Sequence, residues 1–130
     1  MTNPSVLIVE DEAIIALHLK LDLTRLGYDV RGTLSTGEEA VDRAEADPPD
    51  LILMDIRLSG EMDGLEASRR IRTFSDVPIL FLTGFSKPDM EPRISALAPS
   101  AVIRKPAGTR EVVRVMADLL GEAAPGPPEA

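Results

Sequence analysis

The amino-acid sequence predicts an α/β domain built around a parallel sheet of five strands. Short apolar runs alternate along the chain with longer segments of helical periodicity, which is the pattern of successive βαβ units. Residues 51–54 are apolar without interruption, as expected of a strand that is buried on both faces of a parallel sheet. With 130 residues, 44% of them hydrophobic, the chain suits one domain with one core.

Ten elements are expected in alternating order, beginning with a strand. The strands cover residues 6–9, 28–34, 51–54, 77–82 and 101–103. The helices cover residues 12–26, 36–47, 63–73, a part of 86–100, and 108–120. The second strand is less apolar than the others, which favours a position at the edge of the sheet.

Capping residues set the limits of the first two helices. Gly27 suits the left-handed position just past the end of the first helix. Thr36, followed by Glu39 three residues later, has the spacing of a capping box at the start of the second helix. Pro48 and Pro49 end that helix, because proline has no backbone N–H to donate.

The later helices have less uniform signals. Asp63 and Gly64 open the third helix. Pro88 suits the first turn of a fourth helix, but Pro92 lies further in, so this helix is expected to be short or distorted. The last helix has an apolar face formed by Val112, Val113, Val115, Met116 and Leu119.

Composition limits the class of protein. One domain is expected over residues 1–121, followed by a disordered Pro/Ala-rich tail at 122–130. The net charge of −8 and the pI of about 4.6 argue against a nucleic-acid binder. The chain has no cysteine, which excludes disulfides and thiolate chemistry. No apolar stretch could cross a bilayer and no signal peptide is evident, so a cytoplasmic protein without membrane contact is expected.

Polar side chains follow four of the expected strands at the point where each strand ends. Glu10 and Asp11 follow the first strand, Asp55 the third, Thr83 the fourth and Lys105 the fifth. Ligands of open α/β sheets bind outside the carboxyl ends of the strands, so these side chains are expected to converge. Converging carboxylates need a cation, and oxygen ligands suit Mg²⁺. A hydroxyl and an ammonium could then hold a phosphoryl group, with Asp55 as its nucleophile.

Each of these residues also has an ordinary structural interpretation. Asp11 could cap the first helix, Thr83 could belong to a turn, and Lys105 could lie in a solvated loop. These interpretations would have to hold independently at four strand ends, which favours a common site.

Five short motifs stand in order along the chain: Val-Glu-Asp-Glu at 9–12, Met-Asp-Ile-Arg-Leu at 54–58, Met-Asp-Gly-Leu-Glu at 62–66, Pro-Ile-Leu-Phe-Leu-Thr-Gly at 78–84 and Arg-Lys-Pro at 104–106. Together they resemble the receiver domain of two-component response regulators, over residues 5–120. The resemblance implies a doubly wound, flavodoxin-like (βα)5 fold. It also implies that a histidine kinase or phosphotransfer protein passes a phosphoryl group to Asp55, with Thr83 and Lys105 holding its oxygens.

The same resemblance implies a set of metal ligands. By position, Asp11, Asp55 and the backbone carbonyl of Arg57 would bind Mg²⁺, and Glu10 would bind it through water. The implied activity is that of a phosphoryl-accepting signalling domain and not of a turnover enzyme.

Two positions depart from the pattern of the family. Val102 stands three residues before Lys105, where the family usually has Tyr or Phe, a ring that follows the threonine inward on phosphorylation. Ala107 stands where the family often has Phe. Phe85, two residues past Thr83, is either a replacement for the missing ring or an ordinary packing residue.

The first helix is apolar beyond the single stripe of a surface helix. Its apolar residues form two rows, Ile14, Leu17 and Leu21 in one and Ile15, Leu19, Leu23 and Leu26 in the other. The additional row either meets a partner or is buried under neighbouring loops. In receivers this helix contacts the histidine-bearing protein, so Ile14, Ile15 and His18 are the expected contact residues. His18, the only histidine, is interpreted as a surface or boundary residue.

The leading functional hypothesis is a stand-alone receiver, monomeric or weakly dimeric. It would act through contact with an unknown output protein, or serve as a phosphate relay or sink. The second hypothesis is a binding module that works without phosphorylation, which Val102 and Ala107 favour and the intact acceptor site opposes. The third is an aspartyl-phosphate hydrolase of the haloacid-dehalogenase type. That class resembles Asp-x-Asp at its nucleophile, whereas Asp55 is followed by Ile56 and Arg57.

Overall fold

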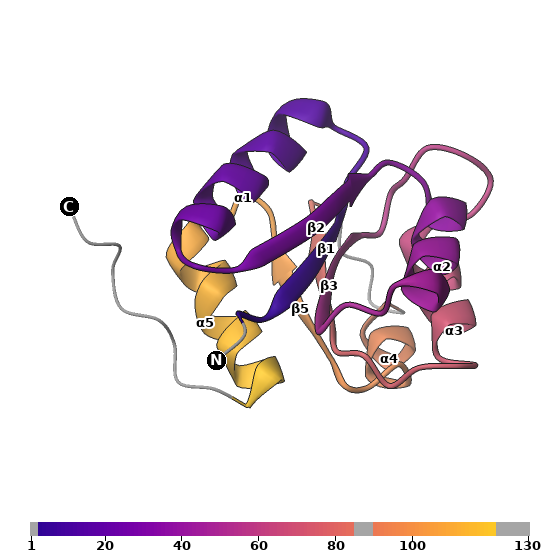
Figure 1. Cartoon of the computed structure of the whole chain (residues 1–130). Coiled ribbons are helices and arrows are strands. Elements are labelled where there is room, and N and C mark those ends of the chain that lie inside the picture. The colour runs from indigo at the N-terminus through magenta and orange to yellow at the C-terminus, as the bar shows by residue number, and fades with distance from the viewer. Residues whose placement is uncertain (1–2, 85–89, 122–130) are drawn as a thin grey trace.

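The computed structural model describes residues 3–84 and 90–121, which form one parallel five-stranded sheet with helices on both sides (Figure 1). The strands are β1 (Ser5–Val9), β2 (Asp29–Leu34), β3 (Leu51–Asp55), β4 (Ile79–Thr83) and β5 (Ser100–Arg104). Their order in the sheet is β2-β1-β3-β4-β5, and each neighbouring pair is parallel. The predicted five-stranded parallel sheet is confirmed, and so is the edge position of the second strand.

The helices make the fold doubly wound. Figure 1 shows α1 (Ala13–Arg25) and α5 (Thr109–Leu120) on one face of the sheet, and α2 (Gly37–Ala46), α3 (Gly64–Ile71) and α4 (Met90–Ser95) on the other. Successive side chains of a strand point to opposite faces, so each inner strand contributes to two cores. This explains why the strands are continuous apolar runs in the sequence, and it confirms the predicted flavodoxin-like fold.

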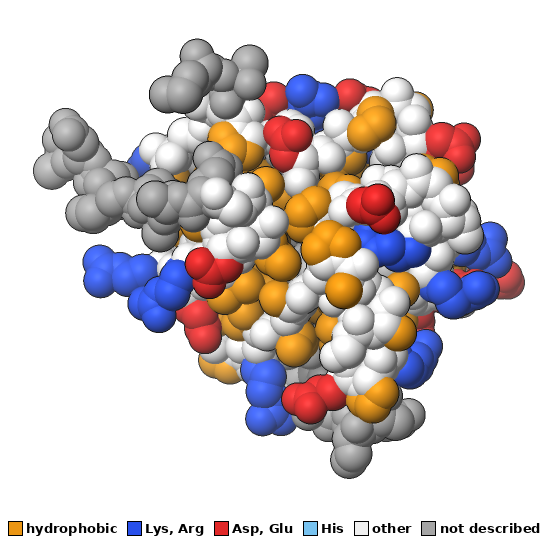
Figure 2. All heavy atoms as spheres, turned by 90° about the horizontal axis from the view of Figure 1, so that it is seen from below, with side chains coloured by type: hydrophobic (Ala, Val, Ile, Leu, Met, Phe, Trp, Pro, Cys, Tyr) orange, Lys and Arg blue, Asp and Glu red, His pale blue; other side chains and the backbone are white. Residues whose placement is uncertain are grey.

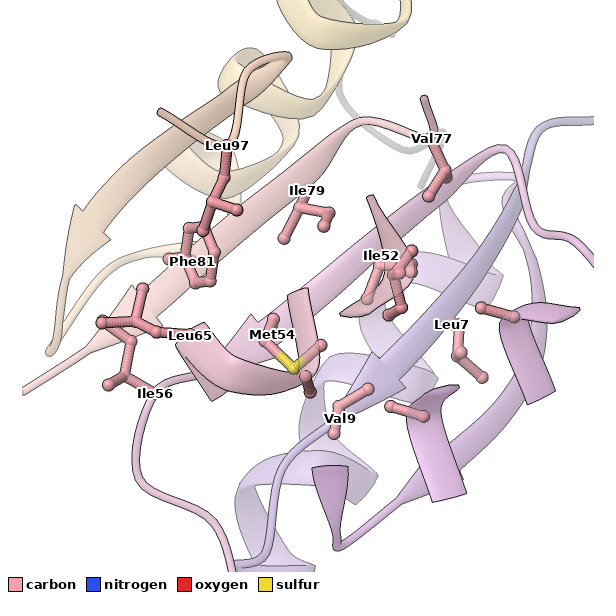
Figure 3. Close-up of a cluster of buried hydrophobic side chains, with 14 of the residues drawn as sticks. Leu7, Val9, Ile52, Met54, Ile56, Leu65, Val77, Ile79, Phe81 and Leu97 are labelled. Carbon is pink, nitrogen blue, oxygen red and sulfur yellow. The ribbon is translucent and has the colours of Figure 1, made fainter. Parts of the chain in front are cut away.

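Alternate residues of each inner strand belong to different cores, one on each face of the sheet. The core under α2, α3 and α4 is shown in Figure 3 and includes Leu7, Val9, Ile52, Met54, Ile79, Phe81, Leu65 and Leu97. The core under α1 and α5 includes Val6, Ile8, Leu51, Leu53, Leu80, Leu82, Leu23, Val112 and Met116. β1, β3 and β4 are packed against helices on both faces, so their carboxyl ends form a rigid support for polar side chains.

The helix limits follow the predicted caps with one difference. The Thr36 hydroxyl oxygen caps α2 by accepting from the backbone N–H of Glu39 at 3.1 Å. The Glu39 carboxylate accepts from the Thr36 hydroxyl at 2.9 Å, instead of from the backbone N–H as in a capping box. Asp63 caps α3 by accepting from the N–H of Glu66. Gly27 has φ +99°, in the left-handed region as predicted.

The structure describes α4 over Met90–Ser95, within residues 86–100 where a short or distorted helix is expected, and residues 86–89 of that stretch lie outside the described residues. Pro92 lies near the beginning of the described part of α4, and its carbonyl oxygen accepts from the N–H of Ala96 at 3.0 Å. β4 begins at Ile79 and not at residue 77, since Pro78 has no N–H for the ladder. Phe85 and the predicted tail lie outside the described residues. None of the helices in residues 3–84 and 90–121 has the combination of length and hydrophobicity that a bilayer-spanning helix needs.

Candidate functional site

The carboxyl ends of four strands bring the predicted site residues together. Asp55 is the last residue of β3 and Thr83 the last of β4, while Glu10 directly follows β1 and Lys105 directly follows β5. The backbone N–H of Lys105 donates to the carbonyl oxygen of Thr83 at 2.8 Å, which continues the pairing of β4 and β5 up to the site. The convergence predicted from the strand ends is therefore present.

Three carboxylates form a close acidic cluster at this edge of the sheet. One carboxylate oxygen from each of Glu10, Asp11 and Asp55 lies within 4.8 Å of the other two. Glu10 and Asp55 are buried, whereas Asp11 is exposed. The N-cap residue of α1 is Glu12, so the alternative interpretation of Asp11 as the helix cap is wrong.

Lys105 compensates two of the three carboxylates. Its Nζ lies 2.5 Å from Oε1 of Glu10 and 3.1 Å from Oδ2 of Asp55. Burial raises the pKa of Glu10 to about 7, and the hydrogen bond to Asp55 adds to this effect while Lys105 opposes it. Burial acts to lower the pKa of Lys105, but the hydrogen bonds to the two carboxylates outweigh it and the pKa is raised. Glu10 therefore holds a proton more readily than an ordinary glutamate, because Lys105 does not offset the combined effect of burial and of Asp55.

Each of the two buried carboxylates also accepts a hydrogen bond from a backbone N–H. The N–H of Arg57 donates to Oδ1 of Asp55 at 3.3 Å, and the N–H of Glu12 donates to Oε2 of Glu10 at 3.3 Å. The first contact keeps the backbone of Arg57 beside the cluster, where its carbonyl is a candidate ligand. Thr83 is buried at the end of β4. The individual chemical roles assigned to these residues remain predictions.

Gly64, the first residue of α3, packs directly against the backbone of Asp55. Its N–H donates to the carbonyl of Ile56 at 2.7 Å. A Cβ added at Gly64 would lie 2.0 Å from the carbonyl oxygen of Asp55, so only glycine fits here. The sequence analysis used Gly64 as a helix start and as part of the motif at 62–66, but neither use indicates that it packs against Asp55.

Ser59 is a second neighbour of the cluster that the sequence analysis did not identify. Its hydroxyl donates to Oδ2 of Asp11 at 3.3 Å, across a separation of 48 residues. A single serine in a loop carries no sequence signal for such a contact, which depends on how the loop after β3 folds back toward β1.

The donor set fits a hard divalent cation. The carboxylates of Glu10, Asp11 and Asp55 offer only oxygen ligands. The carbonyl of Arg57, which the family resemblance adds to the set, would be a fourth oxygen. Mg²⁺ takes one or two carboxylates and keeps several waters, and the exposure of Asp11 leaves one side of the cluster open to water. An ammonium group already lies between two of the carboxylates, which shows that the cluster attracts positive charge.

The two apolar rows of α1 have different environments. Leu23 is buried, and Leu19 and Leu26 are partly buried in the core beneath α1 and α5. The other row exposes 84% of Ile14, 54% of Leu17 and 60% of Leu21. Burial under neighbouring loops is therefore wrong for this row, and contact with a partner remains the alternative.

A groove of about 470 Å³ lies beside the exposed row, between α1 and the segment after β5. Its lining includes Ile14, Ile15, His18, Lys105, Pro106 and Ala107. The small side chain of Ala107 thus forms part of the groove wall. Val102 lies on β5 and is 39% exposed, and Phe85, the suggested replacement for a ring, lies outside the described residues.

The sheet order, the acidic cluster and the lysine place this chain among open α/β domains whose polar side chains gather at the carboxyl ends of the strands. The sequence matches the family described as response regulator receiver domain over residues 6–117. The chain belongs to this family, the receiver domains of two-component response regulators.

Several relatives resemble this chain over most of its length. The transcriptional regulatory protein PdtaR of Mycobacterium tuberculosis is 36% identical over 108 residues, which cover 83% of this chain and 52% of PdtaR. The alkaline phosphatase synthesis transcriptional regulatory protein PhoP of Bacillus subtilis is 44% identical over 82 residues, 62% of this chain and 33% of PhoP. The chain thus spans about half, or less, of the length of these curated relatives.

Solved structures show the same fold. The signal receiver domain of a modulated diguanylate cyclase from Desulfovibrio desulfuricans G20 has a TM-score of 0.84 and 35% identity, covering 92% of this chain and 94% of that one. The chemotaxis protein CheY4 of Vibrio cholerae has a TM-score of 0.82 and 25% identity, covering 91% and 99% of the two chains.

Proposed function

We propose that this receiver domain accepts a phosphoryl group on Asp55 from a histidine of a kinase or phosphotransfer protein, with Mg²⁺ as cofactor. One observation carries the proposal: Lys105 bridges Asp55 and Glu10, and Asp11 lies within 4.8 Å of both carboxylates. This group presents a nucleophile, cation ligands and a positive charge at one place. We propose a signalling role in the cytoplasm and not enzymatic turnover.

In the proposed transfer, a carboxylate oxygen of Asp55 bonds to phosphorus while the bond from phosphorus to the donor histidine nitrogen breaks. The electron pair of the broken bond stays on the imidazole nitrogen. Lys105, now shared between two carboxylates, would hold one phosphoryl oxygen, and the hydroxyl of Thr83 would donate to another. When bound, Mg²⁺ supplies positive charge that offsets the carboxylates and the phosphoryl oxygens.

We propose that the phosphodonor protein contacts α1. The exposed row on this helix lies beside the groove that reaches Lys105, so a protein seated there has its histidine close to the acceptor site. Ile14 and Ile15 supply apolar contact. His18 is exposed and lies 2.9 Å from Asp22, which places it at the rim of this surface.

Replacing Ile14 with glutamate is expected to slow phosphotransfer from a protein donor about tenfold or more, because a charge replaces an apolar contact. The side chain is 84% exposed, so the fold should be unaffected. The measurement compares transfer from a phosphorylated histidine phosphotransfer protein that labels wild type with labelling by acetyl phosphate. Phe74→Glu, the same change at another exposed apolar residue, should leave both rates unchanged. Equal slowing by both variants, or slowing with acetyl phosphate, would argue against α1 as the contact.

The output is proposed to be contact with another protein, or service as a phosphate relay or sink by a monomer or weak dimer. Figure 2 shows one face of the molecule, with positive and negative side chains interspersed around its margin. The net charge of the whole chain is −8, which does not favour nucleic-acid binding. PdtaR and PhoP are named as transcriptional regulatory proteins, and both are longer than this chain.

The proposed function predicts one phosphoryl adduct per chain when wild type is treated with acetyl phosphate and Mg²⁺, read by intact mass. Asp55→Asn should show none, and removal of Mg²⁺ with a chelator should abolish the adduct in wild type. Asp42→Asn, the same change on the exposed surface of α2, should behave as wild type. Absence of an adduct at saturating donor would favour a binding module that works without phosphorylation. Sustained hydrolysis of p-nitrophenyl phosphate would instead indicate a hydrolase.

A further inference from the structure

The loop between β3 and α3 is attached to the acidic cluster on one side. It runs from the residue after Asp55 to the α3 cap, and Ser59 lies near its middle. The hydroxyl of Ser59 donates to Oδ2 of Asp11 at 3.3 Å. Asp11 is the exposed member of the cluster, whereas Glu10 and Asp55 are buried and share the ammonium of Lys105.

The same loop is attached to the first turn of α2 on its other side. Oε1 of Glu38 accepts from the backbone N–H of Met62 at 3.1 Å. Thr36, the cap of α2, forms an isolated parallel bridge with Ser59. Gly60 has φ +92°, and a Cβ there would lie 2.7 Å from Oε2 of Glu38, so the loop lies flat against this carboxylate. These contacts fix the backbone that carries Ser59.

We infer that Ser59 is a positioning residue that orients the Asp11 carboxylate toward a divalent cation, and that Glu38 holds the loop in place for it. The inference rests on the proposed function, since it assumes that Asp11 is a ligand. An exposed carboxylate without such a donor loses rotamer freedom when it binds a cation, and this loss weakens binding. With one oxygen of Asp11 on the Ser59 hydroxyl, the other is left for the metal. Outer partners of this kind commonly change metal affinity by about 10–100-fold.

The test measures Mg²⁺ binding to the metal-free protein by isothermal titration calorimetry, with the metal alone. Ser59→Ala is expected to weaken binding by about threefold to tenfold, which is at or below the lower limit of such effects because the contact is exposed. Ser59→Thr keeps the hydroxyl and should restore most of the affinity. Glu38→Ala should weaken binding in the same direction, since it releases the loop at Met62.

Phosphorylation supplies a second readout that a merely structural role would not move. Ser59→Ala should need more Mg²⁺ for half-maximal labelling by acetyl phosphate, but reach the wild-type rate when Mg²⁺ saturates. The thermal midpoint of the metal-free variant should match wild type. Ser95→Ala, the same change at an exposed position on α4, should have no effect on Mg²⁺ affinity.

Two outcomes overturn the inference and are distinguishable. If wild type binds Mg²⁺ and is labelled, but Ser59→Ala binds Mg²⁺ equally well, Ser59 does not position Asp11 and the proposed function stands. If wild type itself neither binds Mg²⁺ nor is labelled, the proposed function fails and the inference fails with it.

Discussion

Replacing Gly64 with alanine is expected to lower the free energy of unfolding by about 3 kcal/mol or more, a large part of the stability of a domain of this size. The new Cβ would lie 2.0 Å from the carbonyl oxygen of Asp55 and 2.9 Å from the Cα of Ile56. Both neighbours are backbone atoms of a buried strand end, so no side-chain rotation relieves the clash. Either α3 moves away from β3, or the backbone that carries the phosphoryl acceptor is displaced.

The measurement is denaturant unfolding of the metal-free protein, followed by circular dichroism. Gly108→Ala is the matched control, because the same methyl group at the start of α5 meets no atom within 4 Å and its φ of −74° suits alanine. That variant should stay within about 1 kcal/mol of wild type. A Gly64→Ala protein as stable as the control would mean that α3 does not approach Asp55 as closely as the structure shows.

The fold could be predicted from sequence because both faces of each inner strand are buried, so nearly every position of these strands must be apolar. Val6 and Leu7 face opposite cores, yet both must be apolar, so β1 is a continuous apolar run. β2 lies at the edge of the sheet and is partly exposed, so its sequence mixes polar and apolar residues. The limits were less predictable near proline: β4 begins after Pro78, because Pro78 has no backbone N–H for the ladder.

The site was only partly predictable for a different reason. Strand ends bring Asp55 and Lys105 to one edge whatever the loops do, so their convergence follows from topology. The contact of Ser59 with Asp11 and the packing of Gly64 depend on the path of one loop, which no local pattern encodes. Which apolar row of α1 is buried could not be predicted for a third reason. Both rows are apolar, so periodicity does not show which one faces the core.

Replacing Lys105 with methionine is expected to reduce labelling by acetyl phosphate about 100-fold or more. The variant keeps a long apolar side chain but removes the only charge that directly bonds both Glu10 and Asp55 among the described residues. A preorganised positive charge that meets developing charge on a phosphoryl oxygen commonly contributes about 2.7–4 kcal/mol to the rate. Initial rates of adduct formation by intact mass, at saturating Mg²⁺, measure the loss. A rate within threefold of wild type would remove Lys105 from the proposed chemistry.

The same variant should also change how stability depends on pH. In wild type the pKa of Glu10 is raised to about 7 in the folded protein, above its ordinary value of 4.5. The folded state therefore binds this proton more tightly than the unfolded state, so the stability contributed by protonated Glu10 is present at low pH and is lost as pH rises through 4.5 to 7. Lys105 lowers the pKa of Glu10, so without it the pKa rises further and the loss continues above pH 7.

Metal-free Lys105→Met should accordingly resemble wild type near pH 5.5 and become less stable than wild type by about 1–2 kcal/mol near pH 8. Lys20→Met, the same change at an exposed position on α1, should show no such growing difference. If the deficit at pH 8 arises from uncompensated carboxylates, saturating Mg²⁺ should remove most of it, since a divalent cation replaces the missing charge. Labelling should nevertheless stay slow, because the cation cannot take the place of Nζ at the phosphoryl oxygen. A deficit that is independent of pH and of Mg²⁺ would show that Lys105 stabilises the fold by packing and not by charge.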